Sequence, residues 1–274
     1  MLGSSLSSSI TRAIAFAILA TAATGQNFRI ETKVYLTPKE QGKETLVSEN
    51  LTIFRGGIVY DFLKHQPGAR PSGDVTILDP TPRGQRMIVM DPNRQVKIEM
   101  PWKEIDDFLR KVHAAAEGND DPFIRFLANP KFTEGWDARA KRLVLSSDWM
   151  KYDLQTTDFP DDGARRQYRD FRNWYAKLNC MSNPLSLPPF ARLEVNRHLD
   201  HRKQIPREVR LVLFLQERHV KIRSMHAIQW NLTQADAEQI RQADKQYKDF
   251  KTISFPEYHR QPQQTQRPKD APRR

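Results

Sequence analysis

Hydrophobic and polar residues alternate along much of the chain, and turn residues separate the alternating runs. In the first run, Phe28, Ile30 and Val34 share one parity while polar residues take the other, which is the period of a half-buried strand. Pro92 favours a tight turn between two such runs, so we expect the strands around it to pair antiparallel. The predicted strands are 28–36, 46–55, 58–63, 75–79, 86–91, 94–100, 131–136, 142–147, 149–155, 190–199, 208–216 and 220–232.

Elsewhere the hydrophobic period changes to that of an amphipathic helix. Pro101 can open the first helix, where Trp102, Ile105 and Phe108 form an apolar stripe. Further helices are predicted at 121–128, 162–181 and 233–247. No internal break or repeat requires a second domain. The predicted fold is therefore one α+β domain, an antiparallel incomplete β-barrel of about ten strands with helices packed on or inside its concave face.

The first 25 residues have the pattern of a secretory signal peptide. Arg12 precedes an apolar run at 13–20, which is shorter than a membrane-spanning helix, and small residues follow it. We expect cleavage near Ala22 to Gly25 and a periplasmic or secreted protein. The predicted organisation is a signal peptide at 1–25, a single half-barrel domain at 26–255 and a disordered, basic, proline-rich tail at 256–274.

The charge of the chain changes the expected partners. Its 274 residues carry a formal net charge of +11, and a basic surface favours anionic partners such as lipid headgroups or an anionic envelope surface. Export argues against nucleic acid as a partner. Cys180 is the single cysteine, so no internal disulfide can form, and we expect a buried, inert thiol.

Familiar catalytic motifs are absent from the sequence, which contains no glycine-rich phosphate loop, no HExxH and no nucleophile elbow. The densest metal-like group, His198, Asp200 and His201, is interpreted as a solvated strand end. Asp61 lies in an apolar strand and is either a buried acid with a raised pKa or, as we favour, a residue that faces solvent or a basic neighbour. We therefore expect no enzyme, no cofactor and no metal.

Two predicted strands, 58–63 and 209–215, have apolar residues at both odd and even positions, and hence on both faces. Either both of their faces are covered by a solid core, or one face lines a cavity. For a cavity, the predicted contacts of an apolar or lipid-like ligand are Tyr60, Phe62, Trp102, Phe108, Phe126, Leu213 and Trp230. A basic rim for an anionic headgroup is predicted at Arg210, Lys221 and Arg223.

The element order resembles that of the bacterial periplasmic lipoprotein carriers, the superfamily of outer-membrane lipoprotein localisation factors. Segments 79–80 (Asp-Pro), 87–94 (Met-Ile-Val-Met-Asp-Pro-Asn-Arg) and 206–211 (Pro-Arg-Glu-Val-Arg-Leu) contribute to the resemblance. It implies a half-barrel with an apolar cavity for acyl chains, and hence a non-enzymatic carrier. One departure is that carriers place an amphipathic helix before the first strand, where this chain has strand 28–36. The alternative function is an envelope structural or interaction protein with a solid core, which binds anionic polymer or a membrane surface.

Overall fold

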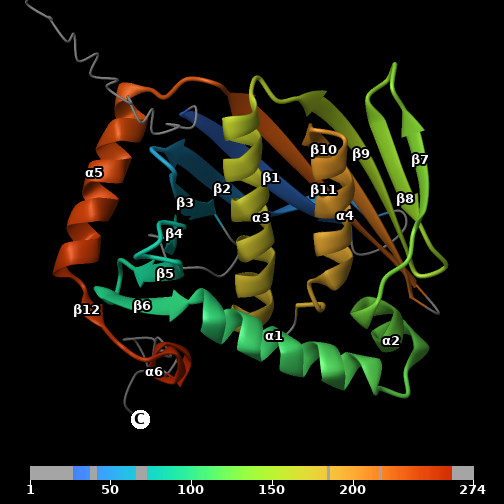
Figure 1. Cartoon of the computed structure of the whole chain (residues 1–274), viewed down its shortest axis with the longest axis horizontal. Coiled ribbons are helices and arrows are strands. Elements are labelled where there is room, and N and C mark those ends of the chain that lie inside the picture. The colour runs from blue at the N-terminus through green and yellow to red at the C-terminus, as the bar shows by residue number, and fades with distance from the viewer. Residues whose placement is uncertain (1–26, 38–41, 66–72, 184–185, 216–217, 261–274) are drawn as a thin grey trace, which may run out of the picture.

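A computed structural model describes residues 27–37, 42–65, 73–183, 186–215 and 218–260 (Figure 1). Within these residues the strands are β1 (Phe28–Thr37), β2 (Thr45–Arg55), β3 (Ile58–His65), β4 (Val75–Asp79), β5 (Arg86–Asp91), β6 (Val96–Pro101), β7 (Thr133–Asp137), β8 (Arg142–Ser146), β9 (Met150–Asp158), β10 (Gln204–Leu215), β11 (Arg218–Gln229) and β12 (Lys251–Thr252). The helices are α1 (Trp102–Glu117), α2 (Pro122–Ala128), α3 (Asp162–Ser182), α4 (Phe190–His201), α5 (Gln234–Asp249) and α6 (Phe255–Arg260).

The strands form one open sheet in the order β12-β6-β5-β4-β3-β2-β1-β11-β10-β9-β8-β7. Neighbours pair antiparallel, except that β12 pairs parallel with β6. Hairpins connect most sequential strands. At the β2–β3 turn, Gly56 and Gly57 both adopt positive φ angles, a conformation that strains other residues. The central β1–β11 pair joins the first six strands to the later ones, and places Thr32 opposite His226.

Helices cover both faces of the sheet. Helices α3 and α4 lie over one face, with α1 crossing beside them, whereas α5 lies apart from this group (Figure 1). We call the face under α3 and α4 the inner face, and the opposite face the outer face. On the inner face, one apolar core lies beneath α1 and α3 and a second beneath α2 and α4. A third core lies on the outer face, where Ile240 and Ala243 of α5 pack against Leu51 and Ile53 of β2.

The structure confirms the predicted fold class, an α+β domain whose antiparallel sheet is not closed into a barrel. The predicted strand at 190–199 is wrong, because this segment is helix α4. Its buried residues Ala191, Val195 and Leu199 recur every four positions, which is the spacing of one helix face. The ordered chain also continues past the predicted domain end, since α6 reaches Arg260. The predicted signal peptide and residues 261–274 of the predicted tail lie outside the described residues.

No helix in the described segments is both long and apolar enough to cross a lipid bilayer.

Candidate functional site

An aromatic layer covers the inner face of the sheet beneath α3. Phe28 of β1 stacks on Phe54 of β2, with ring centroids 4.0 Å apart. Trp230 lies 5.3 Å from the Phe28 ring, and Phe171 of α3 meets Phe54 edge-on at 5.6 Å. Phe28 and Phe54 have no exposed surface. The rings of this layer meet in one parallel stack, one tilted contact and one edge-on contact, of which the edge-on contact is a favoured geometry for aromatic pairs.

A half-exposed apolar seam leads from the surface to this layer. Trp102 of α1 stacks on Trp174 of α3, with centroids 4.4 Å apart. Phe108 of α1 and Met181 of α3 are also half-buried and pack against the same core. We call these four residues the α1–α3 seam. Such a row of partly exposed large apolar side chains, continuous with a buried core, is a feature of surfaces that bind apolar partners.

One ion pair closes the seam. Lys177 of α3 donates to Asp106 of α1 at 2.8 Å, and its ammonium group lies 3.9 Å from the Trp174 ring centroid. Lys177 and Asp106 are partly exposed, so this pair contributes on the order of 1 kcal/mol or less. The two helices are therefore held together mainly by ring stacking and apolar contact at this point.

The structure separates the predicted ligand contacts into three groups. Tyr60 and Phe62 belong to the outer-face core under α5, where the Tyr60 hydroxyl donates to Asp244 at 2.9 Å. Phe126 and Leu213 belong to the inner-face core beneath α2 and α4. The inner-face core beneath α1 and α3 contains the remaining three, Trp102, Phe108 and Trp230. Alternation explains the separation, because Val59 and Asp61 of β3 face α3, so that Tyr60 and Phe62 must point the other way.

The predicted basic rim lies on the outer face, away from the aromatic layer. Arg210 donates to Glu208 at 2.9 Å, and Arg223 donates to Glu44 at 2.9 Å, while Lys221 is exposed. The hydrogen bond from Arg223 lowers the pKa of Glu44. These carboxylates offset much of the positive charge that the sequence alone assigns to the rim.

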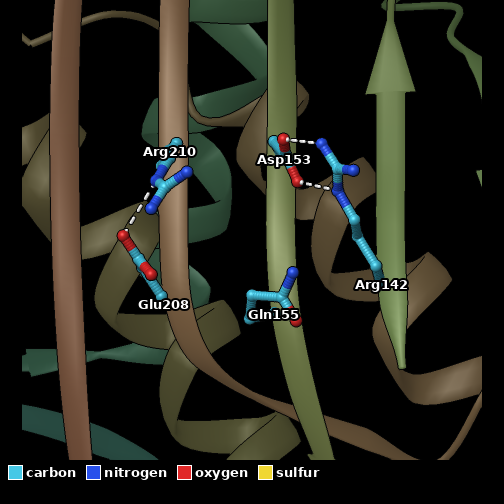
Figure 2. A pocket seen from close by; sticks show the side chains of 5 residues that line it. All are labelled: Arg142, Asp153, Gln155, Glu208 and Arg210. Carbon is cyan, nitrogen blue, oxygen red and sulfur yellow. Dashed lines mark hydrogen bonds and ion pairs between the residues drawn. The ribbon is translucent and has the colours of Figure 1, made fainter. Parts of the chain in front are cut away.

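Figure 2 shows a shallow outer-face pocket that includes Arg210. Arg142 and Asp153 form a two-pronged ion pair across β8 and β9, with one hydrogen bond at 2.8 Å. That hydrogen bond lowers the pKa of the Asp153 carboxyl. The pocket has a volume of about 210 Å³ and its lining is charged or polar. An acyl chain would gain little there, since binding sites for apolar ligands are lined mainly by hydrophobic side chains.

A smaller pocket of about 130 Å³ lies between α3 and strands β3 to β5. Asp61 is at its base and is only 4% exposed. It accepts hydrogen bonds from Asn50 at 2.8 Å and Thr52 at 2.6 Å, and a further one from the Tyr175 hydroxyl. Burial raises the pKa of Asp61, and these three hydrogen bonds oppose the rise.

The favoured interpretation of Asp61 is therefore wrong. Its side chain neither faces solvent nor pairs with a basic group, because its partners are neutral and it points toward α3. The sequence did not reveal this orientation, since a strand that is apolar on both parities does not indicate which face is buried. The volume beside Asp61 is below the roughly 300 Å³ at which small-molecule sites begin.

Two residues of the metal-like group, His198 and Asp200, contact charged side chains of neighbouring elements. His198, on α4 rather than at a strand end, lies 3.1 Å from Glu194 and also pairs with Glu134 of β7. Asp200 accepts from Arg165 of α3 at 2.6 Å. Within the described part of the chain, no group of three or more potential ligands could hold a metal ion. These contacts connect α4 to β7 and α3.

Sequence reasoning missed two features of this face. Trp174 lies in the predicted helix 162–181 but was not among the predicted ligand contacts, although Trp102 stacks on it from another segment. The inward residues of α4, among them Arg192 and Asn196, were missed because the segment was taken for a strand. The four-residue spacing of Ala191, Val195 and Leu199 was the signal that could have identified them.

Comparisons with known proteins give only a weak structural similarity. No protein-family model matches the sequence, and no curated protein matches it. The solved crystal structure of a LolA superfamily protein from Nitrosomonas europaea is similar over 77% of this chain and 89% of that chain. The sequence identity is 7% and the TM-score is 0.30. This is a weak resemblance at the level of the fold, and no residue role follows from it.

Proposed function

We propose that the protein is an exported, non-enzymatic binding protein that holds an acyl chain or another apolar ligand between the inner face and helices α1 and α3. The observation that supports this proposal is the α1–α3 seam, three partly buried aromatic side chains and Met181 that pack against the core containing the aromatic layer. Neighbouring positions of α1, such as Lys103 and Glu104, expose charged residues. The seam instead offers an apolar path from the surface to the core.

Binding requires the two helices to part. The described pockets that α3 lines are small, about 210 and 130 Å³, so an acyl chain must replace contacts that α1 and α3 make with each other and with the sheet. Each methylene that leaves water contributes about 0.8 kcal/mol. A chain of about ten methylenes can therefore offset the loss of the Trp102–Trp174 stack, which is worth about 1 kcal/mol beyond its buried area, and of the Lys177–Asp106 pair.

Fluorescent fatty-acid titration tests the seam. The double variant Trp102→Ala/Trp174→Ala should change the affinity of the full chain for a fluorescent fatty acid at least tenfold, because both rings line the entry. Met225→Ala is the matched control, since Met225 is a 44% exposed apolar residue on the outer face. Equal affinities in the seam variant, the control and the wild type would contradict entry between α1 and α3.

The alternative, an envelope interaction protein with a solid core, is favoured by one observation. The inner face is filled by side chains, and the described pockets there offer no enclosed apolar volume for a chain. On this alternative the contact with anionic polymer or membrane belongs to the basic surface. Binding to anionic vesicles should then be salt-sensitive and should fall when residues 261–274 are deleted, while fatty-acid titration gives no signal.

A further inference from the structure

A second group of side chains lies beneath the helices, beside the aromatic layer. Arg172 of α3 is 6% exposed and faces α4, where one of its terminal nitrogens donates to the backbone carbonyl of Asn196. Helices α3 and α4 lie side by side over the central strands of the sheet (Figure 1). Arg192 comes from α4 and is half-buried. His226 comes from the inner face of β11, where its Nδ1 lies 3.0 Å from the hydroxyl of Thr32. We call Arg172, Arg192 and His226 the buried cationic cluster.

In the described part of the chain, several hydrogen-bonding groups of the cluster have no protein partner. Nε and Nη1 of Arg172 and Nε2 of His226 are shielded from solvent and have no hydrogen-bond partner. Most buried polar atoms in folded proteins have at least one partner. When Nδ1 of His226 accepts from the Thr32 hydroxyl, Nε2 carries the hydrogen and offers another donor. With that tautomer the unfilled groups of the cluster are donors, while beside them Oδ1 of Asn196 is a shielded acceptor that also has no partner.

The electrostatics of the cluster also favour an anion. Burial, followed by the charge of Arg192, lowers the pKa of His226 to about 3, so His226 is neutral at pH 7 and the positive charge of the cluster comes from Arg172 and Arg192. Burial lowers the pKa of Arg172 to about 10, and Arg192 contributes to this shift as well. Arg192 thus acts on groups from both α3 and β11. Within the described residues, no carboxylate forms an ion pair with Arg172 or Arg192. Asp200, which acts on Arg172, is already bonded to Arg165 at 2.6 Å.

The cluster adjoins the aromatic layer. The Arg172 guanidinium carbon lies 5.2 Å from the ring centroid of Tyr168, and that ring lies 6.3 Å from Phe54. A ligand whose apolar chain lay among these rings could place a charged end at Arg172. We infer that the buried cationic cluster binds the anionic group, a carboxylate or a phosphate, of a ligand held beneath α3 and α4. For the ligand's apolar chain this inference rests on the proposed function, whereas the anion site rests on the cluster alone.

Calorimetric titration of the full chain separates the two parts of the inference. The probes are laurate, dodecyl phosphate, dodecanol, acetate and inorganic phosphate, with the alkyl probes kept below their micelle concentrations. Arg192→Gln and Arg172→Met should weaken laurate or dodecyl phosphate binding about tenfold or more, because each removes charge-assisted hydrogen bonds. Both variants should bind dodecanol as the wild type does. The matched control is Arg197→Gln, which removes an exposed arginine from the same helix and should change neither affinity. Thermal melting confirms that each variant is folded.

Each outcome decides between the proposals. The stronger binder of laurate and dodecyl phosphate identifies the headgroup. If dodecanol binds as tightly as laurate, or if the variants lose both equally, the anion site is overturned while chain binding stands. Suppose that acetate or inorganic phosphate binds, that its affinity falls in the variants, and that laurate or dodecyl phosphate binds no more tightly. The anion site then stands and the proposed function fails. Absence of binding by every probe would overturn both.

Discussion

Replacement of Arg172 by methionine tests whether its charge serves the fold or a ligand. Arg172 is 6% exposed, and methionine is an unbranched apolar side chain that can fill part of the same volume. The variant loses the hydrogen bond to Asn196, worth about 1.5–3 kcal/mol for a charged donor, and the contact with the Tyr168 ring, worth about 0.5–2 kcal/mol. It also removes two buried N–H groups without partners, each of which costs about 1–3 kcal/mol.

These contributions nearly cancel. We therefore expect the unfolding free energy of Arg172→Met, measured by urea denaturation without ligand, to lie within about 1 kcal/mol of the wild type. Leu199→Ala on the adjacent helix is the comparison. Leu199 is fully buried, and its truncation should cost about 2–5 kcal/mol. A saturating anionic amphiphile should then stabilise the wild type by about 2.7 kcal/mol at one hundred times its dissociation constant, and Arg172→Met, which binds it about tenfold or more weakly, by about 1.4 kcal/mol or less. A loss of 3 kcal/mol or more in ligand-free Arg172→Met would show that the charge holds the fold together, and would refute the reasoning.

Three further predictions concern the buried polar groups and the thiol. Asp236→Ala should lower the unfolding free energy by about 3–5 kcal/mol in thermal melts, because Asp236 is 1% exposed and pairs with Arg29 at 2.9 Å; an effect below 1 kcal/mol would contradict this. For Asp61, burial raises the folded-state pKa above the ordinary 3.8, so its contribution is present at low pH and is lost as pH rises through the folded pKa. In urea titrations from pH 3 to 8, the stability of the wild type relative to Asp61→Asn should thus fall as pH rises, and a flat or rising difference would contradict the assignment. Burial raises the pKa of Cys180, so iodoacetamide should alkylate the native protein much more slowly than the denatured protein, and equal rates would count against a protected thiol.

The sequence predicts the strands and most helices because their periodicities are long and their turns carry clear signals. The turn at Pro92 joins β5 and β6 as predicted, and α5 begins one residue after the predicted start at 233, where Thr233 and Asp236 form a capping box. Helix α4 was missed although Ala191, Val195 and Leu199 keep the spacing of one helix face, so the error lay in the period assigned to this segment. Asn196, a polar residue buried beside them, is placed inward by tertiary packing and not by the local pattern.

The other difficulty was to assign the side chains of a strand to the two faces of the sheet. Strand β3 is apolar on both parities because α5 covers one face and α3 the other, so the sequence could not place Tyr60 and Asp61 on their sides. The buried cationic cluster was also beyond sequence reasoning. Arg172, Arg192 and His226 come from three separate elements, and nothing in the spacing of these residues indicates that they meet.

Native mass spectrometry of the protein purified from its envelope fraction, followed by solvent extraction, tests the central claim most directly. The account predicts a bound species with the mass of an acyl-chain amphiphile, released on extraction and identified in the organic phase. It also predicts that the extracted protein takes up added laurate. A protein that is reproducibly free of ligand after mild purification, and that remains unliganded in the presence of laurate and dodecyl phosphate, would contradict the claim that this fold carries an apolar ligand.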